Sequence, residues 1–165
     1  MRLLLPLLTA GAALVLVAAP VTGQRPDDQL LPRSVELLRQ GEAQLAAGKF
    51  TEADEALETA LAVDPRNRAA YVALARVAQK QKLFGQAIRY TKRALALEPN
   101  DRDAIAIQGE AMVELGATAR ARENLAKLQK LCGATGCPQV AQLSAAISRG
   151  PTVAAAKPAA TPKSN

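Results

Sequence analysis

The sequence predicts an all-helical protein: a solenoid of three helix pairs closed by a helix that caps the end of the stack. Two observations support this fold class. The hydrophobic residues, 49% of the 165-residue chain, are mostly Ala and Leu, and only four residues are aromatic. Ala and Leu are strong helix formers, whereas a β-sandwich or barrel needs β-branched and aromatic residues in alternation. The second observation is an internal repeat.

An interval of 34 residues recurs along the chain. Residues 34–67 and 68–101 align without a gap, and 102–135 form a third, degenerate copy. Six pairs of identical residues stand 34 apart in this register: Phe50 and Phe84, Ala53 and Ala87, Ala60 and Ala94, Leu61 and Leu95, Ala62 and Ala96, Pro65 and Pro99. Six matches in one register indicate a structural repeat, in which stacked units bury a continuous core.

Each copy predicts two antiparallel helices. In the first copy, Gly48 separates the helices and the second runs from Thr51 to about Val63. Thr51 is expected to cap that helix, and Asp64–Pro65 ends it because proline cannot continue the hydrogen-bond ladder. In the next copy, Asn100 or Asp101 is expected to cap the following helix.

Small residues are predicted where the two helices of a pair approach closely. Ala53, Ala87 and Ala121 take this place in the three copies, and a larger side chain there would force the backbones apart. Phe50 and Phe84, just after the turn within each copy, are expected to fill the space between neighbouring pairs. The sequence therefore predicts which helix faces meet.

This pattern resembles the tetratricopeptide repeat family. The family's large fourth residue is matched by Leu37, Tyr71 and Ile105, its small eighth residue by Gly41, Ala75 and Gly109, its Ala at position 20 by Ala53, Ala87 and Ala121, and its Pro at position 32 by Pro65 and Pro99. The resemblance covers residues 34–135. It implies a right-handed α-solenoid that binds protein segments in a concave groove lined by the first helix of each pair.

The resemblance also implies which residues line that groove. The proposed binding residues are Leu38, Glu42, Leu45, Val72, Arg76, Gln79, Lys80, Ala106, Glu110 and Val113. Their neighbours at further groove positions are Val35, Ala46, Ala69, Asp103 and Glu114. The alternative is that Leu38, Leu45 and Val113 are partly core and the charges only a solvated face. The family's two-carboxylate clamp for chaperone tails is disfavoured, because its Lys and Asn positions hold Leu38 and Glu42.

The third copy departs from the pattern, as terminal repeats commonly do. Residues 136–149 are predicted to contain the capping helix, with Val140, Leu143 and Ile147 on one apolar face. Cys132 and Cys137 are expected to form a disulfide that staples the preceding turn, worth about 2 kcal/mol in the chain-entropy model. A redox centre or a metal site fits the four-residue interval less well.

The two ends of the chain predict export and a tail. Residues 1–23 have the charge, apolar run and small residues of a signal peptide, and an uncleaved membrane anchor is the alternative. Residues 24–33 are read as a leader, and 150–165 as a disordered tail rich in Ala, Pro and Lys. The expected location is the periplasm, where an oxidising environment permits the disulfide.

Composition argues against an enzyme. Histidine is absent, which excludes the usual triads and His-ligated metals, and no cofactor motif occurs. Glu52, Asp54, Glu55 and Glu58 crowd one helix, but a short amphipathic helix leaves most of them in water. Nucleic-acid binding is disfavoured because three of the four aromatic residues are explained by packing and Lys80, Lys82, Arg89, Lys92 and Arg93 look like ordinary helix surface.

The resulting hypothesis is an exported binding module that has no catalytic residues, cofactor or metal and engages a peptide or helical segment of a protein partner. The alternative is an accessory or assembly subunit of a cell-envelope complex that binds through its convex face or tail. Membrane contact is expected only through the signal segment or through such a complex.

Overall fold

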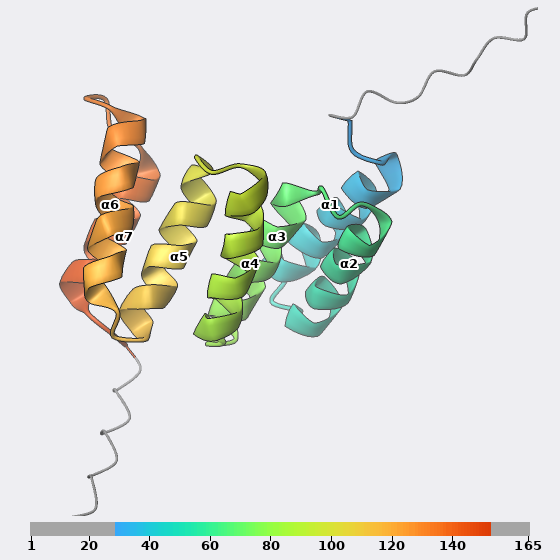
Figure 1. Cartoon of the computed structure of the whole chain (residues 1–165). Helices are drawn as coiled ribbons and strands as arrows, with labels where there is room; N and C mark the ends of the chain where they lie inside the picture. Colours follow the sequence, from blue (N-terminus) through green and yellow to red (C-terminus); the bar gives the residue numbers. More distant parts are fainter. Residues whose placement is uncertain (1–28, 153–165) are drawn as a thin grey trace, which may run out of the picture.

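The computed structural model describes residues 29–152, which form a row of antiparallel helices (Figure 1). The predicted signal segment, most of the leader and most of the tail lie outside the described residues. Within them the helices are α1 (Pro32–Ala46), α2 (Phe50–Val63), α3 (Arg68–Lys80), α4 (Phe84–Leu97), α5 (Arg102–Glu114), α6 (Thr118–Cys132) and α7 (Pro138–Arg149). The predicted three helix pairs and capping helix are confirmed.

The helices form two layers. The pairs are α1 with α2, α3 with α4 and α5 with α6, and successive pairs stack side by side (Figure 1). Among the described residues, the backbone of α3 also approaches those of α1 and α5, whereas the backbones of α2, α4 and α6 lie further apart. The first helices therefore lie closer together and form the inner layer, which α7 extends by packing on α5 and α6.

The alanines predicted at the close approaches occupy equivalent places. Ala53, Ala87 and Ala121 are all fully buried. A glycine allows an equally close contact in the first pair, because a Cβ added at Gly41 would lie 2.5 Å from Cγ of the fully buried Leu57. Phe50 packs against the core cluster that the first pair shares with α3, as predicted for a residue between neighbouring pairs. The small residues therefore set how closely the helices approach.

One predicted cap is wrong and one is confirmed. Thr51 does not cap α2: the helix begins one residue earlier, and its N-cap, Lys49, makes no side-chain cap bond. Gly48 adopts a positive φ of 73°, which turns the chain early enough to place Thr51 within the first turn. Asp101 does cap α5, accepting a hydrogen bond from the Ala104 amide at 2.7 Å.

The leader boundary also differs from the expectation. The predicted leader ended at residue 33, but α1 already begins at Pro32. Proline suits this place because the first helical residue needs no amide donor and its fixed φ is helical. The amide of Leu31 donates to Asp64 Oδ2 at 3.0 Å, which ties the start of α1 to the end of α2.

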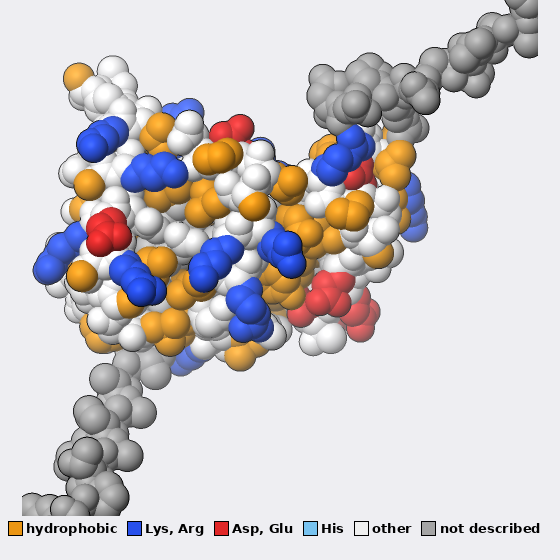
Figure 2. Space-filling model, in the orientation of Figure 1, with side chains coloured by type: hydrophobic (Ala, Val, Ile, Leu, Met, Phe, Trp, Pro, Cys, Tyr) orange, Lys and Arg blue, Asp and Glu red, His pale blue; other side chains and the backbone are white. Residues whose placement is uncertain are grey.

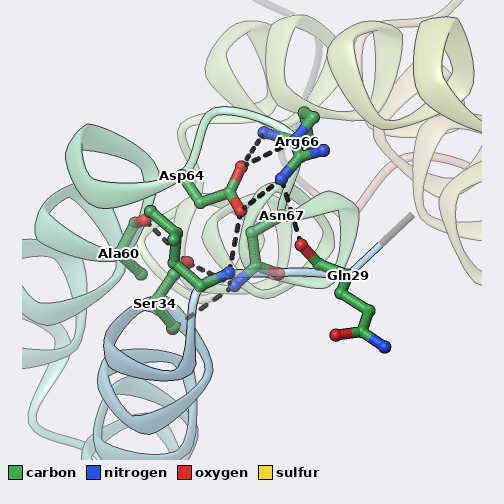
Figure 3. Close-up of polar contacts among 7 residues, drawn as sticks. Gln29, Ser34, Ala60, Asp64, Arg66 and Asn67 are labelled. Atoms are coloured by element: carbon green, nitrogen blue, oxygen red, sulfur yellow. Dashed lines mark hydrogen bonds and ion pairs between the residues drawn. The ribbon is translucent and has the colours of Figure 1, made fainter. Parts of the chain in front are cut away.

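A buried polar contact joins α1 and α2 to Asn67, the N-cap residue of α3 (Figure 3). The hydroxyl of Ser34 donates to the Ala60 carbonyl at 2.8 Å, and the side-chain amide of Asn67 donates to the Ser34 hydroxyl at 2.8 Å. Ser34 and Asn67 are both fully buried. The next junction uses a different chemistry at the same repeat positions, where the guanidinium of Arg68 pairs with the buried carboxylate of Asp101.

Asp64 is held as a carboxylate beside this contact (Figure 3). The Arg66 side chain donates to it, and so do the amides of Leu31 and Arg66, which together lower its pKa from 3.8 to about 2 although burial opposes the shift. The stabilisation is therefore fully present above about pH 4 and is lost as the pH falls towards 2.

Replacing Asp64 with asparagine is expected to destabilise the protein at neutral pH. The substitution removes the negative charge and puts an NH2 group, which donates, in place of one carboxylate oxygen that accepts hydrogen bonds. The difference in unfolding free energy between the variant and the unchanged protein is expected to shrink as the pH falls from 4 to 2. Urea unfolding followed by circular dichroism across this range checks it. A difference independent of pH would contradict the role of the charge.

The two ends of the stack are finished differently. At the first end, a polar surface between α1 and α2 is formed largely by Gln40, Gln44, Glu52, Glu55 and Thr59. At the other end, α7 buries Leu143 completely against Ile105 and Leu128. The predicted disulfide is present, with the Cys132 and Cys137 sulfurs 2.01 Å apart.

Candidate functional site

The candidate site is the inner face formed by α3, α5 and α7. The positions proposed from the sequence divide into buried and accessible residues. Val72, Ala106 and Val113 are at most 5% exposed, so they were wrong as contact residues. They are buried because neighbouring inner helices pack together: Val72 of α3 and Ile107 of α5, for example, belong to one buried cluster. These three positions hold the layer together rather than face a partner.

The first repeat contributes little polar surface to this face. Leu38 and Leu45 are half-buried and pack against the core that the first pair shares with α3, as the alternative interpretation expected. Glu42 is exposed and lines none of the grooves described below. The accessible polar side chains are therefore concentrated on α3, α5 and α7.

Asp103 connects three helices on this face. One of its carboxylate oxygens accepts from the Arg76 guanidinium of α3 at 2.8 Å, and the other accepts from the Gln139 side-chain amide of α7 at 2.7 Å. The side chains of Arg76 and Asp103 keep 43% and 42% of their surface exposed. Both are thus held in position and still accessible to a ligand. Sequence reasoning missed Gln139 because α7 lies outside the repeat register.

A second polar link lies one helical turn along. The side-chain amide of Gln79 donates to the Ile107 carbonyl at 3.3 Å and to the Glu110 carboxylate at 3.1 Å. Gln79 and Glu110 are half-buried, whereas the neighbouring Lys80 is exposed. The residues predicted on α3 and α5 are therefore brought together, and they pair with each other across the two helices.

Two shallow grooves flank these links. One, of about 560 Å³, lies at the first turns of α3, α5 and α7 and is lined by Arg68, Asp101, Arg102, Asp103 and Gln139, among others. The other, of about 320 Å³, lies at the opposite end of the same helices, and its polar lining comprises Gln79, Lys80, Lys82, Glu110, Glu114, Arg149 and Thr152. The site is an elongated polar surface that carries both positive and negative groups.

The outer face has a different charge pattern. Figure 2 shows Lys and Arg side chains spread over α4 and α6 and a cluster of acidic side chains over α2. Both sets are exposed apart from the half-buried Asp54: the cations are Arg89, Lys92, Arg93, Arg120, Arg122, Lys127 and Lys130, and the acids are Glu52, Asp54, Glu55 and Glu58.

The acidic residues of α2 do not form a sheltered catalytic pair. Burial raises the pKa of Asp54, and the charge of Glu58 raises it further. Its neighbours Glu52, Glu55 and Glu58 are exposed to solvent. In residues 29–152, no three His, Cys, Asp or Glu side chains come close enough together to hold a metal ion. No helix in that part of the chain is both long and apolar enough to span a membrane.

Comparison with known proteins bears on the fold. Residues 44–106 match the model of the tetratricopeptide repeat family. No curated protein matches the sequence. The first TPR domain of Spaghetti (RPAP3), solved with an HSP90 peptide, superposes with a TM-score of 0.65 at 20% identity, covering 71% of this chain and 91% of that domain.

The fold is that of a tetratricopeptide-repeat solenoid. The TPR2B domain of yeast Sti1, solved as a complex with pHsp70, gives a TM-score of 0.63 at 20% identity over 71% of this chain and 97% of that one. The O-GlcNAc transferase of Thermobaculum terrenum gives 0.57 at 22% identity, over 60% of this chain but only 19% of the transferase chain. Tetratricopeptide repeats thus occur both in peptide complexes and within an enzyme.

Proposed function

We propose that the protein is a non-enzymatic interaction module that binds a segment of a protein partner on the inner face of α3, α5 and α7. The observation that carries this proposal is the set of half-exposed polar links, Arg76 with Asp103 and Gln79 with Glu110, lying between two grooves. These groups are positioned by the fold yet accessible, so a partner can exchange their contacts for its own. The similar domains of Spaghetti and Sti1, solved with an HSP90 peptide and as a complex with pHsp70, support binding of a protein segment by this fold.

The chemistry of the face suggests the kind of segment. Positive and negative groups are both present, so we infer an extended or helical segment that carries both signs of charge, which fix its register. A purely acidic peptide tail fits less well, because Leu38 and Glu42 hold the positions where the clamp subtype needs Lys and Asn.

Charge reversal tests the inner face. Arg76→Glu combined with Lys80→Glu is expected to weaken capture of the native partner about tenfold or more, since both cations become repulsive to acidic groups of the partner. Proteins pulled down from a native extract by the unchanged protein, identified by mass spectrometry, supply the partner for a titration. The matched control, Arg89→Glu with Lys92→Glu, makes the same charge change on the outer face of α4.

The opposite result favours a second candidate function. If the inner-face variant binds normally and the α4 variant does not, the protein binds through its convex face, as expected of an accessory subunit of an envelope complex. The exposed cations of α4 and α6 are the observation in favour of it (Figure 2). Substrate turnover by the purified protein that disappears on carboxylate substitution would instead reveal an enzyme.

We also propose that the protein is exported to the periplasm. The charge and apolar pattern of residues 1–23 and the Cys132–Cys137 disulfide, which persists in oxidising compartments, support this location. Mass spectrometry of the protein recovered from its native envelope tests the proposal. Loss of the first segment is expected, and an intact segment on cytosolic protein would contradict it.

A further inference from the structure

We propose that the groove between α3, α5 and α7 is occupied by the chain's own following segment, residues 153–165, which a partner must displace. Displacement of the segment by a partner rests on the proposed function, whereas occupation of the groove by the segment does not. The starting observation is Thr152, whose amide and hydroxyl both donate to Glu114 Oε2 at 2.8 Å. Glu114 belongs to the inner face of α5, so the chain returns to that face after α7.

The turn after α7 sets this direction. Gly150 ends the helix with φ at 76°, a conformation that favours glycine, and its amide donates to the Ala146 carbonyl at 3.0 Å. Two residues later Thr152 forms part of the groove wall, together with Lys80, Glu110 and Arg149. The described part of the chain therefore ends at the groove. The tail prediction for 150–165 is thus modified at Thr152, which bonds to Glu114 of α5.

The segment has the composition for such a groove. Residues 153–165 contain Lys157 and Lys163, no acidic residue, and otherwise mostly Ala, Pro and small polar side chains. Two prolines favour an extended chain without bulky groups, which suits a shallow surface. Glu110 in this groove and Asp103 further along the inner face offer carboxylates to the two lysines. Lys80, Lys82 and Arg149 line the same groove, so the lysines of the segment must lie beside the carboxylates and away from these cations.

The segment is also long enough. Thirteen residues in an extended conformation span about 40 Å at ~3.1 Å each. Successive inner helices pack about 8–10 Å apart, so the distance from α7 across α5 and α3 to α1 is roughly 30 Å. Being attached at Thr152, the segment has an effective concentration on the order of millimolar at the groove, and a modest affinity is sufficient for occupation.

A labelled peptide tests the occupation directly. A fluorescent synthetic copy of residues 153–165 is titrated against the full-length protein and against full-length Lys157→Glu with Lys163→Glu, with binding followed by fluorescence anisotropy. The variant's own segment no longer competes, so the peptide is expected to bind the variant at least about tenfold more tightly than the unchanged protein. The matched control Lys92→Glu with Lys130→Glu makes the same charge change on the outer face and is expected to behave like the unchanged protein.

Two outcomes would overturn the proposal: equal binding to all three proteins, or no binding to the variant at peptide concentrations up to about 1 mM. Carbodiimide crosslinking of the unchanged full-length monomer gives a second readout. Lys157 or Lys163 is expected to join Asp103 or Glu110 within one chain, and crosslinks only to outer-face carboxylates would exclude the groove.

The test is separable from that of the proposed function. Loss of partner capture in Arg76→Glu with Lys80→Glu, together with a negative peptide result, leaves partner binding in place and removes the occupation. If the peptide binds the lysine variant more tightly and the Arg76→Glu, Lys80→Glu variant still captures the partner, occupation of the groove stands and partner binding on the inner face is excluded.

Discussion

Leu143→Ala is expected to lower the free energy of unfolding by about 2–5 kcal/mol, the range for truncating a fully buried leucine. Leu143 is the main apolar contact of α7 and packs against Ile105 and Leu128, with no exposed surface. Urea unfolding followed by circular dichroism measures the loss. A change below about 1 kcal/mol would show that α7 contributes little to the stability of the stack.

Gly109 provides the control for this contact. A Cβ added there would lie 2.7 Å from both terminal methyl carbons of Leu143, so Gly109→Ala alone is destabilising. In the double variant, the alanine methyl enters space that Leu143→Ala vacates. The combined loss should therefore be smaller than the sum of the single losses, whereas strict additivity would mean that the two residues do not meet.

Gly41→Ala is expected to lower the free energy of unfolding by about 1–3 kcal/mol, the usual cost of overpacking. The added methyl would meet Leu57 at 2.5 Å from Cγ, an atom near the backbone of a side chain that is itself fully buried. Leu57 has no solvent-exposed space to move into. The two helices of the first pair must therefore separate, and the same urea titration measures the cost.

Gly85→Ala, in contrast, is expected to raise the free energy of unfolding. Gly85 is an exposed helical residue of α4, and its nearest neighbour would be the end of the Arg89 side chain at 4.0 Å. Alanine there gains helix propensity, about 0.5–1 kcal/mol, without a clash. If both alanine variants change stability in the same direction, the close approach at Gly41 is not the reason for its glycine.

The repeat register was sufficient to predict the fold. Identical residues 34 apart must occupy equivalent places in a stack, so the register alone predicts Ala53, Ala87 and Ala121 at the helix crossings. Local rules predicted the Asp64 end of α2 and a cap of α5 at Asn100 or Asp101, of which Asp101 is the cap. These features depend on local backbone rules that each repeat obeys separately.

The site could be predicted only in part, because exposure depends on neighbouring repeats. A groove position is accessible only if the next inner helix does not cover it, and Val72 is buried in a cluster that includes Ala104 and Ile107 of α5. The partners of Arg76 and Gln79 lie 27 and 31 residues away, and their pairing is not encoded in a single repeat. Gln139 and Thr152 lie outside the register altogether, so no repeat comparison could have found them.

The unequal ends of the stack determine how a chain lacking α7 would assemble. Loss of this helix would uncover Ile105 and Leu128 at one end, while the polar side chains of Gln40, Glu52 and Thr59 remain at the other. Growth into a fibre requires that the two ends of the stack bind each other. Here only the uncovered end would be apolar, and the polar end between α1 and α2 would not bind it. Two shortened copies would therefore join through their uncovered ends into a closed two-fold dimer, and no surface would remain for a third.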